Sequence, residues 1–112
     1  NKTTIPKDDF IVENSNATVR LPFHAVEYIM TDDPHRLALV TLDRIVYFYG
    51  TLKEIEIVDE RLFRCHQSYV VNITQMSSYD AKQKMMILKS GKRIPVSRRL
   101  VSKVRTMLKG EM

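Results

Sequence analysis

Residues 62–72 read Leu62-Phe63-Arg64-Cys65-His66-Gln67-Ser68-Tyr69-Val70-Val71-Asn72. Apolar residues fill both ends of this stretch, and three hydrogen-bonding residues, His66-Gln67-Ser68, separate the two apolar runs. Aromatic and β-branched residues on either side of a short polar segment are typical of two strands joined by a turn. We therefore expect strands at Leu62–Cys65 and Tyr69–Asn72.

The same strand-like pattern fills most of the remaining sequence. It is clearest between residues 17 and 23, where every second residue is apolar, because side chains of a strand alternate between its two faces. Turn-forming residues at 14–16 and 32–34, and Ser90-Gly91, separate neighbouring strands. The other expected strands are Phe10–Glu13, Ala17–Phe23, Ala25–Thr31, Arg36–Thr41, Ile45–Tyr49, Gln75–Tyr79, Lys84–Lys89 and Arg93–Pro95.

Two segments change from strand periodicity to helical spacing. Leu52, Ile55 and Val58 lie three residues apart, which predicts a short helix over Thr51–Val58 with Thr51 as its N-cap. Near the end of the chain, apolar residues follow one helix face between Ser97, the expected N-cap, and Gly110. These apolar residues are Leu100, Val101, Val104, Met107 and Leu108. Many short antiparallel strands with two accessory helices make a mainly-β domain.

Length and composition indicate one domain. A chain of 112 residues can bury a core without metals or disulfides, and we expect that domain over residues 9–112, behind a linker remnant at 1–8. Because the sequence starts at Asn1, with neither an initiator Met nor a signal peptide, we expect a longer protein. The single cysteine, Cys65, excludes an internal disulfide and fits a cytoplasmic protein. No apolar run approaches the roughly 18 residues of a membrane-spanning helix.

Positive charge is concentrated at the C-terminal end. Residues 1–88 carry 10 Lys and Arg against 12 Asp and Glu, a balance of −2, whereas residues 89–112 carry 8 against 1, a balance of +7. Such asymmetry suits a polyanion, either nucleic acid or an acidic membrane surface. A solvated helix face would show the same asymmetry.

Catalytic and metal-binding patterns are missing from the sequence. Cys65 and His66 are adjacent, but neighbouring strand residues point to opposite faces and cannot form a nucleophile–base pair without a bend. The histidines and the cysteine lack zinc spacing, and the three glycines form no phosphate-binding loop. We predict no enzyme, no metal and no cofactor. A partly exposed Cys65 thiolate beside Arg64 would be open to oxidation, although a small buried strand residue is the more common role.

Three segments carry side chains that suit DNA binding. Gln67 can pair with adenine and Ser68 can reach bases or phosphates, although an ordinary polar turn would use the same residues. Arg98 and Arg99 lie in the first turn of the expected helix, where each opposes the macrodipole by about 0.3–1 kcal/mol. A bound phosphate would remove that conflict. His35-Arg36, in the turn after residue 34, is the third segment, although by residue type alone an exposed His is usually incidental.

Three blocks share their order and spacing with a known family. The blocks are Tyr47-Phe48-Tyr49-Gly50-Thr51-Leu52-Lys53-Glu54, the stretch 62–72, and Ile94-Pro95-Val96-Ser97-Arg98-Arg99. Together they resemble the LytTR family over about residues 9–108. The resemblance implies an elongated sandwich of short antiparallel sheets, with a short helix in the middle and a C-terminal amphipathic helix. It also implies sequence-specific binding of double-stranded DNA by the output domain of a two-component response regulator that controls transcription.

The resemblance also implies which residues touch DNA, because the family inserts loops rather than a recognition helix into the grooves. Carried over position by position, the base contacts fall on His35, Gln67 and Arg98. The backbone contacts fall on Arg36, Lys53, Arg64, Ser68, Lys89 and Arg99. A close member of the family has Asn where this chain has Gln67 and Arg99, so the preferred base can differ.

The implied partners are promoter repeats, an N-terminal receiver domain in the full-length bacterial protein, and a second copy that forms a homodimer on DNA. Peptide quorum sensing, virulence and bacteriocin production are the processes that the resemblance implies. The alternative is a membrane-surface or protein-interaction module that uses the basic helix Arg98–Lys109. A helix that also covers a β core would have its apolar stripe occupied.

Overall fold

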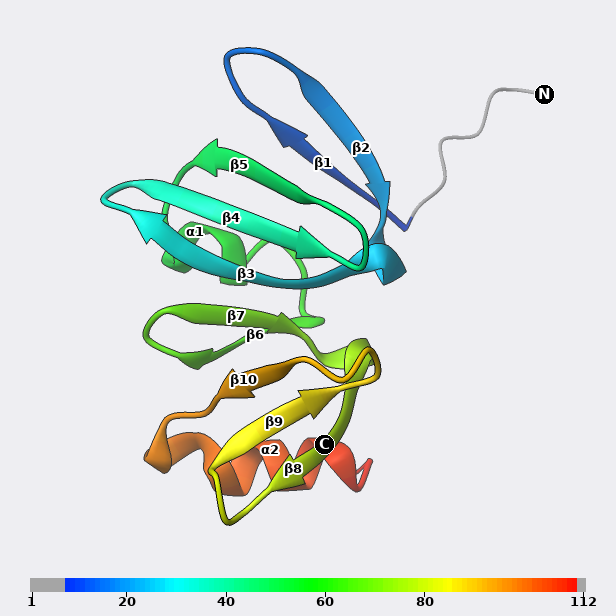
Figure 1. The fold of residues 1–112 in the computed structure, drawn as a ribbon, viewed down its shortest axis with the longest axis vertical. Helices are drawn as coiled ribbons and strands as arrows, with labels where there is room; N and C mark the ends of the chain where they lie inside the picture. The colour runs from blue at the N-terminus through cyan, green and yellow to red at the C-terminus, as the bar shows by residue number, and fades with distance from the viewer. Residues whose placement is uncertain (1–7, 111–112) are drawn as a thin grey trace, which may run out of the picture.

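The computed structural model describes residues 8–110, which form three antiparallel sheets stacked along the long axis of the molecule (Figure 1). Its extents are 46 × 38 × 25 Å, so the predicted mainly-β, elongated fold is confirmed. The first sheet pairs β1 (Asp9–Glu13) with β2 (Thr18–Pro22). The central sheet, in the order β5-β4-β3-β7-β6, contains β3 (Val26–Asp33), β4 (Arg36–Thr41), β5 (Ile45–Tyr49), β6 (Leu62–His66) and β7 (Tyr69–Asn72). The third sheet, in the order β10-β9-β8, contains β8 (Met76–Asp80), β9 (Met85–Leu88) and β10 (Arg93–Pro95).

Strands β4, β5, β7 and β10 have the predicted bounds, and the others differ by one or two residues at one or both ends. The main difference is a 3-10 turn, η1 (Phe23–Ala25), where the sequence predicted the end of one strand and the start of another. Strand β2 ends at Pro22, and the Phe23 N–H still donates to the Asp8 carbonyl as the chain enters the turn. The turn directs the ring of Phe23 into the core, edge-on to Phe10 with ring centroids 6.2 Å apart.

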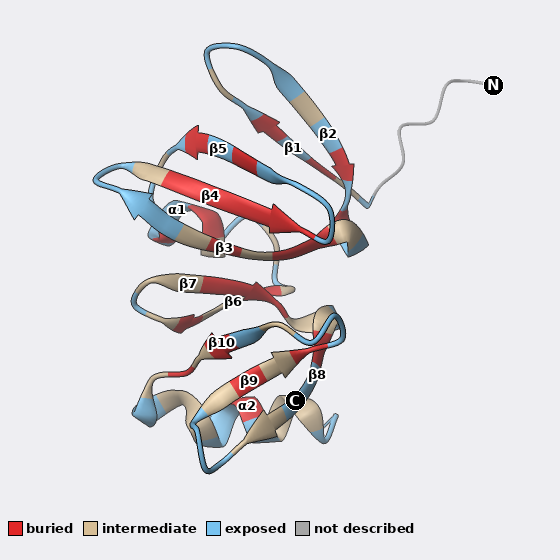
Figure 2. Cartoon of the chain, viewed as in Figure 1, coloured by how far each residue is buried: buried red, intermediate tan, exposed pale blue. Residues whose placement is uncertain are grey.

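The central sheet has a hydrophobic core on each of its faces (Figure 2). One core packs this sheet against the β1–β2 hairpin and α1 (Leu52–Glu56), and the other packs it against the third sheet and α2 (Val101–Leu108). Strand alternation divides neighbouring residues between the two cores. Val70 therefore belongs to the first core and Val71 to the second.

Helix α1 begins as the sequence predicts and ends earlier. The Thr51 hydroxyl accepts a hydrogen bond from the Glu54 N–H at 3.2 Å, and the Glu54 carboxylate accepts one from the Thr51 N–H at 3.0 Å, which forms a capping box. Leu52 and Ile55 are buried, but Val58 is 60% exposed. The expectation that Val58 shares their face is wrong, because the helix ends at Glu56 and Val58 lies beyond it.

The C-terminal helix starts with a 3-10 turn, η3 (Arg98–Leu100), which continues into α2. Ser97 occupies the N-cap position of η3, as predicted, but its side chain makes no capping hydrogen bond; its carbonyl accepts from the Leu100 N–H at 2.8 Å. Gly110 adopts a positive φ of 78° just past the helix, as predicted. The predicted apolar stripe packs on the second core, with Val104 fully buried.

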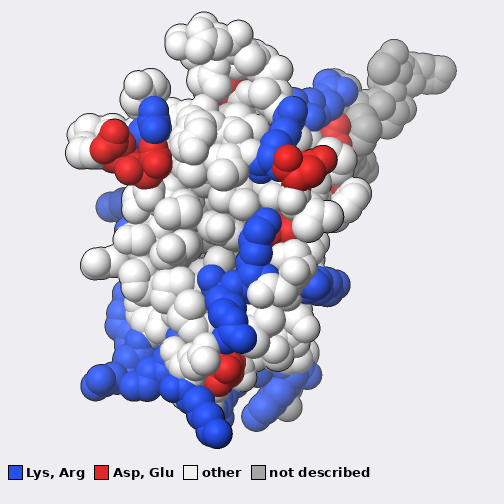
Figure 3. Space-filling view, in the orientation of Figure 1, with Lys and Arg blue, Asp and Glu red and all other residues white. Residues whose placement is uncertain are grey.

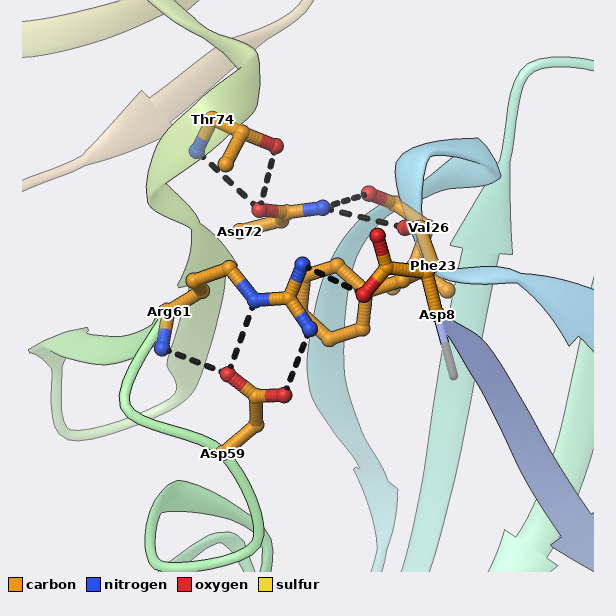
Figure 4. A network of polar contacts seen from close by, with 7 residues as sticks. All are labelled: Asp8, Phe23, Val26, Asp59, Arg61, Asn72 and Thr74. Atoms are coloured by element: carbon orange, nitrogen blue, oxygen red, sulfur yellow. Dashed lines mark hydrogen bonds and ion pairs between the residues drawn. The ribbon is translucent and has the colours of Figure 1, made fainter. Parts of the chain in front are cut away.

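A buried amide joins the central sheet to the η1 turn (Figure 4). Asn72 is fully buried, and its Nδ2 donates to the carbonyls of Phe23 at 3.1 Å and Val26 at 2.9 Å. Its Oδ1 accepts from the N–H of Thr74 at 3.0 Å and from its hydroxyl at 2.7 Å. All the hydrogen-bonding capacity of the amide is therefore directed at fixing the chain on either side of it.

Arg61 links three elements beside this amide (Figure 4). Its Nε and Nη2 donate to the Asp59 carboxylate at 3.0 and 2.8 Å, and Nη1 lies 3.2 Å from Asp8 Oδ1. The guanidinium carbon also lies 3.9 Å from the centroid of the Phe23 ring. The hydrogen bonds from Arg61 lower the pKa of Asp59.

The expected linker remnant, residues 1–8, lies outside the described residues except for Asp8, and the domain expected over 9–112 is described as far as Gly110. Among residues 8–110, no helix combines the length and the apolar character needed to cross a membrane.

Candidate nucleic-acid interface

Three loops from distant parts of the sequence lie on one side of the molecule, at the left in Figure 1. They are the β3–β4 turn with His35, the β6–β7 turn with Gln67, and the segment that leads from β10 through η3. Backbone hydrogen bonds fix their spacing: the Thr31 N–H donates to the Ser68 carbonyl at 3.1 Å, and the Ser97 N–H donates to the Cys65 carbonyl at 2.8 Å. The central loop is thus tied to both of its neighbours.

The β3–β4 turn contains only Pro34 and His35, because Asp33 pairs with Arg36. Pro fixes its own φ near −65°, and His35 has a positive φ of 67°, the combination that type II turns use. Histidine is among the few residues other than glycine that adopt this conformation with some frequency. The Gly50 N–H donates to the His35 carbonyl at 2.9 Å, so the turn is held while the His35 side chain stays exposed.

Arg36, a predicted phosphate contact, is bound by a carboxylate of its own hairpin. Its Nε donates to Asp32 Oδ2 at 2.6 Å, and its guanidinium carbon lies 4.7 Å from the centroid of the Tyr47 ring. This hydrogen bond raises the pKa of Arg36. A phosphate would therefore have to share Arg36 with Asp32.

Two side chains hold the β6–β7 turn without blocking Gln67. The Nδ1 atom of His66 accepts from the Ser68 N–H at 3.1 Å, and Arg64 Nη2 donates to the Gln67 carbonyl at 2.9 Å. The His66 ring also packs edge-on against Tyr69, with centroids 5.6 Å apart. The exposed amide of Gln67 therefore stands on an ordered backbone. Sequence reasoning assigned no role to His66, although its spacing from Ser68 is that of a local loop contact.

The third loop presents basic side chains. Arg98 and Arg99 are exposed in η3, which has no acidic residue in its first turn. Lys103 follows four residues after Arg99 and is also exposed, with Nζ 5.5 Å from the centroid of the Phe63 ring. The sequence analysis missed Lys103 as a site residue. Its i,i+4 spacing from Arg99 was the signal that could have found it.

Two open grooves collect most of the predicted contact residues. One, of about 630 Å³, lies between the second and third loops and is lined by Gln67, Arg99 and Lys103, with Glu56 as its acidic member. The other, of about 200 Å³, lies beside the first loop, and its lining includes His35, Arg36, Lys53 and Arg64. Arg64 lines both grooves, so the two form one surface. Figure 3 shows that Lys and Arg predominate in the lower part of the molecule, which holds the third sheet and α2.

Lys89 does not belong to this surface, and its prediction as a backbone contact is corrected. It lies in the β9–β10 turn, at the right in Figure 1, where its N–H donates to the Gln75 carbonyl at 2.8 Å. It lines a different pocket, together with His24 and Asp43. The sequence showed a basic turn but could not show at which end of the sheet that turn lies.

Cys65 is not the partly exposed thiolate that a redox role needs. The side chain is 0% exposed, and its Sγ donates to the Pro95 carbonyl at 3.6 Å. Burial raises the pKa of the thiol to about 12, which disfavours the reactive form. The redox hypothesis is therefore wrong, and Cys65 is a core residue.

Comparison with known proteins assigns the family. The family model described as the LytTr DNA-binding domain matches residues 16–109. The chain belongs to the LytTR family. This membership agrees with the prediction of a DNA-binding regulator rather than an enzyme.

Individual relatives agree with the assignment. Accessory gene regulator protein A of Staphylococcus epidermidis is 41% identical over 70 residues, which are 62% of this chain and 29% of that protein. The Staphylococcus aureus protein of the same name is 40% identical over a segment of the same length. This chain thus spans less than a third of these relatives. A LytTr DNA-binding domain of a putative methyl-accepting/DNA response regulator from Bacillus cereus has the same fold, with a TM-score of 0.72 at 22% identity over 91% of this chain and 97% of that one.

The membrane-surface alternative loses its main support in this LytTR domain. It required the apolar stripe of the C-terminal helix to be free for lipid. Val104 is instead fully buried, and Leu100, Val101 and Met107 pack on the second core. The basic residues of the helix remain exposed, but without the apolar face that an interfacial helix inserts.

Proposed function

We propose that this LytTR domain reads the sequence of double-stranded DNA through its three adjacent loops. His35 and Gln67 hydrogen-bond base edges, and Arg98 binds guanine. Gln67 accepts and donates through its amide to adenine, either directly or through water. The observation that carries the proposal is the pair of backbone hydrogen bonds that ties the central loop to the loops on either side.

Basic and hydroxyl side chains around these loops bind the phosphates and set the register. Lys53, Arg64, Ser68 and Arg99 are the predicted contacts that border the loops. Arg36 contributes only in competition with Asp32, and Lys103 joins the set because it lines the same groove as Gln67 and Arg99.

The proposal extends to the whole protein. Its relatives are regulators more than three times the length of the matched segment. We infer a cytoplasmic response regulator whose N-terminal receiver domain controls transcription through this domain. Promoter repeats that bind two copies, and peptide quorum sensing of virulence or bacteriocin genes, are the expected context.

Selection from random duplex DNA, followed by substitution of Arg98, tests the proposal. A single enriched motif is expected, and Arg98→Ala should then cost about 1–3 kcal/mol on that motif and flatten preference at one base pair. Lys89→Ala is the matched control, because it removes a positive charge outside the interface. If no motif is enriched, or if Arg98→Ala weakens the motif and a scrambled duplex equally, Arg98 does not read a base.

A further inference from the structure

The outer edge of β1 borders an open groove of about 360 Å³ that shares no lining residue with the two grooves of the DNA interface. All of β1 lines it, together with Phe48, Ile55 and Val58. Val58 is 60% exposed and Ile11 is 55% exposed, so both present apolar side chains to solvent beside this groove. The groove therefore has a strand edge on one side and the apolar residues Phe48, Ile55 and Val58 beside it.

The backbone of β1 has hydrogen-bonding groups free for a further strand. The Phe23 N–H donates to the Asp8 carbonyl, and the Asn14 N–H donates to the Ala17 carbonyl at 2.9 Å, at the two ends of the β1–β2 ladder. In an antiparallel pair, every second residue bonds its partner and the residues between them point away. Counting from Asp8 and Asn14, the N–H and C=O groups of residues 9, 11 and 13 point to the outer edge. Within residues 8–110, β1 pairs with β2 alone.

The charges along this edge select a partner. Asp9 and Glu13 flank Ile11 on the outward face of the strand. Arg20 lies 3.5 Å from Asp9 and is 54% exposed, whereas the Asp9 side chain is 14% exposed; among residues 8–110, Glu13 accepts only from the Thr18 hydroxyl, at 3.2 Å. Cross-strand neighbours share a face. Basic side chains on an added strand would therefore lie beside Asp9 and Glu13 and be stabilised by their negative charge.

We propose that β1 binds an extended protein segment as a third strand, and that this segment alternates apolar and basic residues. Its inward side chains would contact Phe48, Ile55 and Val58, which favours apolar residues. Its outward side chains would lie beside Asp9 and Glu13, which favours Lys or Arg. A second copy of this chain fits poorly, because antiparallel self-pairing centred on Ile11 would place Asp9 opposite Glu13. This binding mode is strand addition at a sheet edge.

Amide hydrogen exchange, with a synthetic peptide as the probe, tests this proposal. The peptide alternates four lysines with three valines, and the control peptide has the same residues in two blocks. Without peptide, the amides of Ile11 and Glu13 should exchange faster than those of Phe10 and Val12, which bond β2. The alternating peptide should protect residues 9, 11 and 13 and bind at least about tenfold more tightly than the block peptide.

Two substitutions at Ile11 and one in the β4–β5 turn make the test specific. Ile11→Pro removes an N–H that the β1–β2 ladder does not use, and Ile11→Lys repels the basic peptide at an exposed position that tolerates Lys. Both should weaken peptide binding at least about tenfold. Leu42→Lys makes a matched charge change at a residue that is 75% exposed and lines a different pocket, and it should leave binding unchanged.

Three results would overturn the proposal. The first is unchanged binding by Ile11→Lys or equal binding of the two peptides. The second is protection that maps outside residues 9–13. The third is a concentration-dependent dimer of the unmodified domain that Ile11→Lys abolishes, because the occupant would then be a second copy.

Discussion

The guanidinium of Arg64 donates from Nη2 to the backbone carbonyl of Gln67 at 2.9 Å, and the same side chain lines both grooves of the DNA interface. Arg64 therefore has two available roles. It can neutralise a phosphate, and it can hold the loop from which the Gln67 amide reaches the DNA. The two roles make different demands, because a phosphate accepts any cation whereas the loop needs this particular hydrogen bond.

Arg64→Lys separates these roles, because it keeps the charge and removes the planar guanidinium. If Arg64 positions Gln67, the Lys variant should lose about 1 kcal/mol on the selected duplex and relax preference at the Gln67 base pair. Binding to scrambled duplex should be nearly unchanged. Unchanged binding to both duplexes would instead make Arg64 a phosphate contact only, because Lys supplies the same positive charge.

Lys103 and Lys89, which lie on opposite sides of the molecule, give a second prediction. Lys103→Ala should weaken specific and non-specific duplexes alike and lower the salt slope of log K by about one, because one phosphate contact is lost. Lys89→Ala should change neither, since Lys89 lies at the opposite end of the sheets. Fluorescence anisotropy between about 50 and 200 mM salt measures both variants. Equal slopes for the two variants would contradict the placement of the interface.

Local sequence rules predicted most of the fold because the strands are amphipathic. β4, β5, β7 and β10 were predicted to the residue, and Thr51 forms the predicted cap. The errors occur where a tertiary contact decides the outcome. The η1 turn directs Phe23 onto Phe10 and follows a proline, and Val58 is exposed because α1 ends before it.

The candidate site likewise contains residues that the sequence could predict and residues whose surroundings depend on tertiary contacts. The resemblance to the LytTR family implied His35, Gln67 and Arg98 as base contacts, and the fold places their three loops on one side. The sequence did not show that Asp32 binds Arg36, or that Lys89 lies at the other end, because both depend on hairpin geometry. Burial of Cys65 depends on the packing of β10 against β6, which is equally invisible in a strand pattern.

The buried thiol gives a third prediction. Because the pKa of Cys65 is about 12 in the fold and about 8.5 for a free cysteine, the native thiolate fraction at pH 8 is roughly a thousandfold lower than in the unfolded chain. Iodoacetamide should therefore label Cys65 in denaturant and hardly label the native domain. Peroxide should also leave DNA binding unchanged. A native labelling rate within about tenfold of the unfolded rate would show that the thiol is accessible.

The ion pair between Asp59 and Arg61 gives a prediction for acid stability. Hydrogen bonds from Arg61 lower the pKa of Asp59 below its ordinary value of 3.8. A carboxyl with a lowered folded pKa contributes stability above the unfolded pKa, and this contribution is lost as the pH falls through the folded pKa. Asp59→Asn should therefore reduce the free energy of unfolding by about 1 kcal/mol at pH 7.

The difference between the two proteins should shrink as the pH falls below about 4 and then through the lowered native pKa of Asp59, because protonation removes the charge that Arg61 binds. Urea denaturation at a series of pH values measures this difference in the free energy of unfolding. Glu60→Gln is the matched control, since Glu60 is an exposed neighbour without an ion-pair partner among residues 8–110. A gap that stays constant from pH 7 to pH 2 would mean that Asn disturbs packing, and that the charge of Asp59 contributes nothing to the joint between Arg61, Asp8 and Phe23.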